Sequence, residues 1–139
     1  LIEKNKDLRV VYKEFPIFGK DSELASKVAM AAAMQGKYIQ LQNALFKVKG
    51  RLNEQRIMEI AKAADLDMER LKTDIKSAKV TDTLKDNRKL AEKIRLMGTT
   101  AFVVISTPNG KLSANGGEAA FIPGAASEDA LQELIDKAK

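Results

Sequence analysis

The spacing of apolar residues changes along the chain and separates a helical middle from strands near both ends. Residues 8–15, Leu-Arg-Val-Val-Tyr-Lys-Glu-Phe, alternate in polarity and are rich in β-branched side chains, which predicts a strand that stops at Pro16. Between residues 22 and 97, apolar positions recur at the three- and four-residue spacing of amphipathic helices. From Ala101 the period returns to two. The predicted order is strand, five helices, β-hairpin and helix.

Capping residues and glycines give the expected helix boundaries. The expected helices are residues 22–35 with Ser22 as the cap, residues 37–48, a helix capped by Asn53, a short helix starting at Asp67, and residues 79–97. The stripe Val-Ala-Met-Ala-Ala-Ala-Met in the first helix is small and suits close helix packing. In the expected helix at residues 79–97, the side chains expected to face inward are Val80, Leu84, Ala91, Ile94 and Met97.

The hairpin is expected to pair residues 101–106 with residues 118–122, with turn chemistry at Thr107 to Gly110 and a stop at Pro123. Ser127 is expected to begin a terminal helix that reaches Lys139. About 75 residues of expected helix separate the expected strand at residues 8–15 from this hairpin in the sequence. Because a lone strand needs a neighbour for its backbone groups, the sheet is expected to be incomplete.

Composition narrows the classes of function. The 139 residues suffice for a single domain, and the longest apolar run, residues 28–34, is far too short to cross a bilayer. Cys and His are both absent, which excludes thiolate nucleophiles, imidazole bases and most soft metal sites. The net charge is +5, but the 24 basic residues interleave with 19 acidic ones along helices, as on solvated faces. No nucleic-acid partner is therefore expected.

Candidate chemistry in the residues themselves is weak. Gly19-Lys20 lacks the upstream glycine and the following Ser or Thr of a phosphate loop, which leaves anion binding at that helix start as a minor alternative. The methionines fall at packing positions, and Asp82 and Asp86 are surrounded by lysines. No catalytic residue, metal site or cofactor is expected in this chain.

Three motifs nevertheless carry a resemblance. "YKEFPIFG" after the first strand, "QGKY" between the first two helices and "GTTAF" before the hairpin together resemble the DsbA-like thiol-disulfide oxidoreductases of the thioredoxin superfamily. The resemblance implies an α/β thioredoxin-like fold over residues 1–139, with a helical insertion at about residues 22–97. It also implies a periplasmic or cell-envelope location and binding to unfolded or extended exported polypeptides.

The resemblance implies in addition that the first strand and the Cys-x-x-Cys helix of the family precede residue 1, so that this chain is expected to be an N-terminally truncated domain. It places substrate binding at Thr99, Thr100 and Ala101, where the family has a cis proline that presents its backbone to substrate. Thr100 stands at the proline position, and a trans bond before it is expected because a cis bond is costly without proline. Gln42 and Asn43 stand where the family often has His and Asp.

Two hypotheses about function follow. The first is a fragment of a protein-disulfide oxidoreductase, inactive by itself, and the second is a non-catalytic thioredoxin-like binding or scaffold module. If the central strand is absent, residues 10–15 and 101–105 expose strand edges, which favours a homodimer or a strand-swapped assembly.

Overall fold

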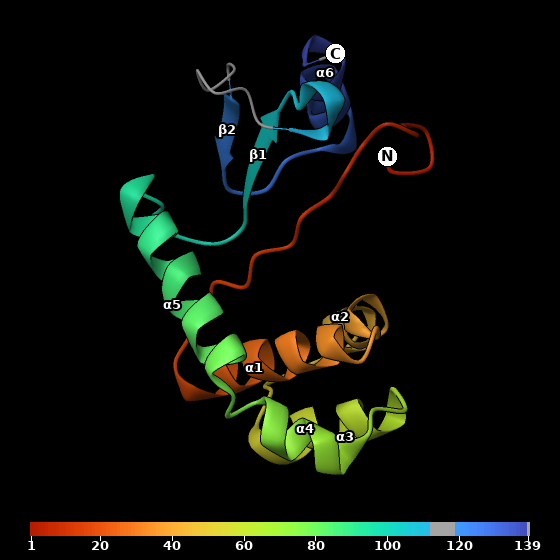
Figure 1. Ribbon diagram of the computed structural model, residues 1–139, viewed down its shortest axis with the longest axis vertical. Helices are drawn as coiled ribbons and strands as arrows, with labels where there is room; N and C mark the ends of the chain where they lie inside the picture. Colours follow the sequence, from red (N-terminus) through yellow and green to blue (C-terminus); the bar gives the residue numbers. More distant parts are fainter. Residues whose placement is uncertain (112–118, 139) are drawn as a thin grey trace. The chain divides into compact units, whose positions relative to one another are not determined.

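The computed structural model of the chain describes residues 1–111 and 119–138. It contains two compact units (Figure 1). Unit 1 is formed by Leu1–Tyr12 and Arg95–Lys139, and unit 2 by Lys13–Ile94.

Unit 2 is helical, as the apolar spacing predicts. Its helices are α1 (Lys20–Met34), α2 (Tyr38–Phe46), α3 (Glu54–Ala63), α4 (Met68–Asp74) and α5 (Ala78–Lys93). The capping role of Asn53 is confirmed, because its side chain accepts a hydrogen bond from the backbone amide of Arg56. Asp67, the predicted start of the next helix, is its N-cap and accepts a hydrogen bond from the amide of Arg70. The number and order of the helices in this segment therefore agree with the prediction.

Several helix ends differ from the prediction by one or more residues, and two of these differences coincide with an unusual backbone torsion. α1 begins at Lys20, with Gly19 at the N-cap position and Ser22 inside the helix. Gly19 has φ of +83°, a conformation that glycine adopts at no steric cost, so the chain enters the helix earlier than a polar cap would indicate. α5 ends at Lys93, and Arg95 has φ of +54°, which ends the helix before the apolar period does. Ile94 and Met97 are therefore 38% and 94% exposed, and the prediction that they face inward is wrong.

The core of unit 2 surrounds α1. This helix contacts α2, α3, α4 and α5, and its buried residues are mostly alanines. Small side chains allow several helices to approach one backbone closely, which agrees with the expectation for the alanine-rich stripe. Each of the five helices contributes one of the largest fully buried side chains: Val28, Leu41, Ile57, Leu71 and Val80.

Unit 1 contains an antiparallel hairpin and one helix. Strand β1 (Ala101–Ile105) pairs with β2 (Ala119–Pro123) in a register that places Ala101 opposite Pro123 and Ile105 opposite Ala119. A short 3₁₀ helix, η1 (Pro108–Gly110), follows β1 where turn chemistry is expected. Pro123 is the last residue of β2 rather than the residue after it, and proline is tolerated at such a strand end. Glu118, the predicted start of this strand, lies outside the described residues.

Helix α6 (Glu128–Lys137) closes unit 1 and contacts β1. The Ser127 hydroxyl accepts a hydrogen bond from the amide of Ala130, so this predicted cap is confirmed. The prediction of a strand at residues 8–15 is wrong, because the sheet in the described part of the chain consists of β1 and β2. A β-rich sequence becomes a strand only where a neighbouring strand can pair with its backbone. None of the helices described is long and apolar enough to cross a membrane.

Candidate functional site

The predicted substrate-binding residues form the corner that leads into β1. Thr99 and Thr100 are exposed, and Ala101 is half-buried as the first residue of the strand. The carbonyl oxygen of Thr100 accepts a hydrogen bond of 2.8 Å from the amide of Gly124, just after β2. The three residues thus lie at one end of the hairpin, with the Thr99 and Thr100 side chains accessible.

The peptide bond between Thr99 and Thr100 is cis, so the expectation of a trans bond is wrong. That expectation considered only the intrinsic preference of a peptide bond without proline. In the folded unit the corner is also held by the segment after β2, through the hydrogen bond from the Gly124 amide to the Thr100 carbonyl. The resemblance implies the same bond geometry where the family has its proline.

A second arrangement, which sequence reasoning missed, lies in unit 2 around the carboxylate of Glu14. The carboxylate accepts hydrogen bonds from three side chains: the hydroxyl of Ser26 at 2.7 Å, the hydroxyl of Tyr38 at 2.5 Å and the amide of Gln42 at 2.6 Å. Gln42 also donates to the Tyr38 oxygen at 2.8 Å. The backbone carbonyl of Glu14 accepts from Asn87, which is buried. We call these five residues the Glu14 cluster.

The Glu14 cluster joins segments that are far apart in the sequence. Ser26 lies on α1, Tyr38 and Gln42 on α2 and Asn87 on α5, so one half-buried residue before α1 ties three helices together. A signal for it was present: Glu14 lies in "YKEFPIFG" and Tyr38 in "QGKY", two of the motifs that carry the family resemblance. Gln42, where the family often has His, keeps a donor on the carboxylate without carrying a charge.

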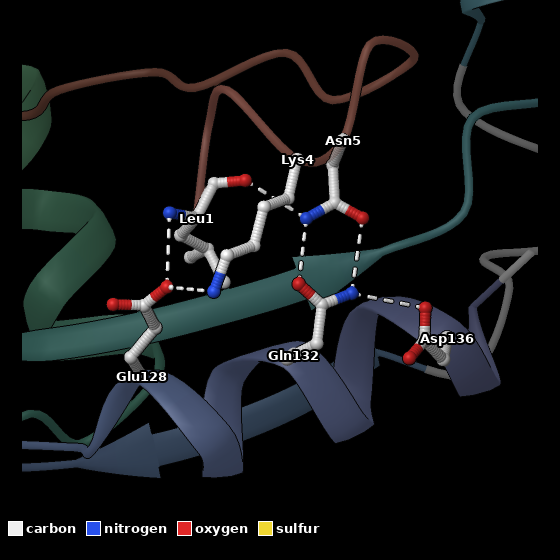
Figure 2. Close-up of polar contacts among 6 residues, drawn as sticks. All are labelled: Leu1, Lys4, Asn5, Glu128, Gln132 and Asp136. Atoms are coloured by element: carbon white, nitrogen blue, oxygen red, sulfur yellow. Dashed lines mark hydrogen bonds and ion pairs between the residues drawn. The ribbon is translucent and has the colours of Figure 1, made fainter.

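A third set of polar contacts fixes the beginning of the chain to α6 within unit 1 (Figure 2). The side chains of Asn5 and Gln132 exchange two hydrogen bonds, of 2.7 and 3.0 Å, and Asn5 is 3% exposed. Lys4 and the Leu1 amino group both contact the carboxylate of Glu128. These hydrogen-bonded cations lower the pKa of Glu128 below its ordinary value. The pairing gives the buried Asn5 amide and the half-buried Gln132 amide hydrogen-bond partners.

The described residues provide little that could carry out catalysis. They contain no group of His, Asp and Glu side chains that could hold a metal ion. The hydroxyl of Ser26 is buried and donates to a carboxylate, but no imidazole exists in the sequence to activate it. Lys20 begins α1 and forms no phosphate loop. The features that remain are an accessible backbone corner at residues 99–101 and two structural polar clusters.

Comparison with known proteins identifies the family. The model of the DSBA-like thioredoxin domain matches residues 1–136. A thioredoxin-like oxidoreductase from Silicibacter pomeroyi DSS-3 is similar, with 31% sequence identity and a TM-score of 0.83 over 99% of this chain and 72% of that one. ScsC of Proteus mirabilis in a compact conformation has 22% identity and a TM-score of 0.77 over 99% of this chain and 69% of that one. A search of curated proteins found no significant match.

The chain therefore belongs to the DSBA-like thioredoxin-domain family, as its motifs indicate. None of its 139 residues is a cysteine. Thiol-disulfide exchange requires a thiolate that attacks a disulfide sulfur. This chain consequently holds no redox centre of its own.

Proposed function

We propose that this chain is the polypeptide-binding part of a DsbA-like protein-disulfide oxidoreductase that acts on exported proteins. The Cys-x-x-Cys pair would then be supplied by residues that precede residue 1 in the complete protein. Thr99, Thr100 and Ala101 would bind an extended substrate through their backbone and hydroxyl groups. The location would be the periplasm or the cell envelope.

The observation that carries the proposal is the family match over residues 1–136, in a chain that is 31% identical to a thioredoxin-like oxidoreductase. The geometry of the corner is consistent with it. Thr99 and Thr100 are exposed at the entry to β1, where a peptide in extended conformation could add hydrogen bonds to the chain.

Two measurements test the proposal. In the first, the protein encoded by the complete reading frame is purified, and its thiols are titrated before and after reduction. This protein is expected to oxidise a dithiol peptide. The activity should be lost when either cysteine of the Cys-x-x-Cys pair is replaced by serine. If the complete protein has no Cys-x-x-Cys pair, the oxidoreductase proposal is wrong and the binding module is the remaining candidate.

The second measurement addresses the corner. Amide resonances of the labelled chain are followed while a permanently unfolded, cysteine-blocked polypeptide is added. The amides of Thr99 and Ala101 are expected to shift most within unit 1, and Thr100→Pro is expected to keep the binding because proline removes only one amide donor. Shifts confined to surfaces away from residues 99–101 would refute this binding site.

A non-catalytic binding or scaffold module is the second candidate. It is favoured by the absence of cysteine and by Thr100 at the position where the family has proline. A homodimer or strand-swapped assembly belongs to this candidate. Val103 and Phe121 are cross-strand neighbours in the hairpin and are 55% and 40% exposed, so an apolar pair lies open on one face of the hairpin. Light scattering of wild-type chain and of Val103→Thr would test whether copies associate through this face.

A further inference from the structure

A groove in unit 2 lies between the segment before α1, α1 itself and α5. Its volume is about 260 Å³. Phe15, Pro16 and Leu84 form an apolar part, and each is half-buried. Ligand pockets for whole small molecules start at roughly 300 Å³. The groove therefore has room for one or two amino-acid side chains.

The rest of the groove is charged. Lys27 and Glu23 come from α1, and they form an ion pair with 2.6 Å between the lysine Nζ and a carboxylate oxygen. The hydrogen bond and charge of Lys27, and then the charge of Arg88, lower the pKa of Glu23 below its ordinary value of 4.5. Glu23 is thus ionised at neutral pH and balances the charge of Lys27.

Two further cations remain on the α5 side. Lys85 and Arg88 line the groove three residues apart, one helical turn, next to Leu84. Both are exposed, and neither forms an ion pair with any residue in the part of the chain that the structure describes. The groove consequently has an excess of positive charge beside an apolar floor.

We propose that this groove binds an acidic segment of a polypeptide, with a Glu or Asp carboxylate at Lys85 and Arg88 and a neighbouring apolar side chain on Phe15 and Leu84. Charge complementarity selects the acidic partner, and the small volume selects side chains of a polypeptide over a larger ligand. The inference rests on the proposed function, since it adds a second contact for the polypeptides bound there. It places that contact in unit 2, away from residues 99–101 in the sequence.

The test uses the full chain and a short fluorescent peptide in which glutamate and leucine alternate, followed by fluorescence anisotropy. Lys85→Gln with Arg88→Gln removes the two cations of the groove. Exposed ion pairs contribute about 0.2–1 kcal/mol each, so the affinity should fall by roughly twofold to thirtyfold. The wild-type affinity should also fall as salt is raised, because the pairs are exposed to solvent.

The matched control is Lys79→Gln with Lys93→Gln, which removes two exposed cations of the same helix that do not line the groove. This variant should bind the peptide as the wild type does. An equal loss of affinity in both variants would show attraction by net charge alone and would overturn the proposal. Displacement of the peptide by inorganic phosphate at constant ionic strength would overturn it too, because the site would then bind any small anion.

The outcome is separable from the fate of the proposed function. Suppose that the glutamate peptide binds the wild type more tightly than Lys85→Gln with Arg88→Gln, while the complete protein lacks a cysteine pair. That result would support the acidic-segment site and refute the oxidoreductase proposal. If the complete protein exchanges disulfides and a peptide with glutamine in place of glutamate binds equally well, the oxidoreductase proposal is supported and the preference of the groove for acidic segments is refuted.

Discussion

The strongest single prediction concerns Glu14→Gln, which keeps the size of the side chain at the centre of the Glu14 cluster and removes its charge. The carboxylate offers two acceptor oxygens to the donors of Ser26, Tyr38 and Gln42. A glutamine amide offers one oxygen, and its NH₂ group would face donors. Ser26 and Tyr38 have hydroxyls that can rotate to accept, whereas the amide of Gln42 retains its contact with the Tyr38 oxygen.

The expected magnitude follows from these contacts. A hydrogen bond to a charged group contributes about 1.5–3 kcal/mol, and a neutral one about 0.5–1.5 kcal/mol. The substitution converts charged contacts into neutral ones and leaves at least one donor poorly paired. Rotation of the hydroxyls recovers part of the loss, and Glu14 is only half-buried. The free energy of unfolding should therefore fall by about 1–3 kcal/mol.

Urea unfolding of the full chain, followed by the helical circular dichroism signal, measures this change. The matched control is Glu59→Gln on α3, where an exposed carboxylate accepts a hydrogen bond from the side chain of Gln55. A change within about 0.5 kcal/mol is expected for this variant. In a double-mutant cycle with Tyr38→Phe, the two substitutions should show a coupling energy of about 0.5–3 kcal/mol. A Glu14→Gln variant no less stable than the control, with no coupling to Tyr38, would refute the structural role of the cluster.

Three further predictions concern other parts of the fold. Asn5→Ala should lower the free energy of unfolding by about 1–2 kcal/mol, because the Gln132 amide loses the side chain with which it exchanges two hydrogen bonds. The control Asn43→Ala, at an exposed position on α2, should change this free energy by less than about 0.5 kcal/mol. Urea titrations of both variants measure the difference. Leu41→Ala should cost about 2–5 kcal/mol in the same assay because Leu41 is fully buried, and a loss below about 1 kcal/mol would contradict the described core. The depressed pKa of Glu23 contributes stability that is present above pH 4.5, the ordinary pKa, and is lost as the pH falls through the lower pKa of the folded state. In Lys27→Gln, the Glu23 carboxyl measured by NMR titration should therefore have a pKa closer to 4.5, and an unchanged value would show that Lys27 is not the cause.

The sequence by itself determined the local elements. Asn53, Asp67 and Ser127 each accept a backbone hydrogen bond at the start of the helix that they were predicted to cap or to begin. The alternation from Ala101 predicted β1, and three short motifs identified the family that the comparisons confirm. These features could be predicted because capping and periodicity depend on residues only a few positions apart. The absence of cysteine, and with it of a thiol redox centre, is likewise a property of the sequence alone.

Only the tertiary structure decided the features that depend on distant partners. Residues 8–15 have the composition of a strand but form none, since pairing requires a neighbouring strand. α5 ends at Lys93 although the apolar period continues to Met97, because a backbone torsion at Arg95 redirects the chain. The partners of Glu14 lie 12, 24 and 28 positions away on two different helices. Such contacts arise when packed helices bring side chains together, and no periodicity along the chain encodes them.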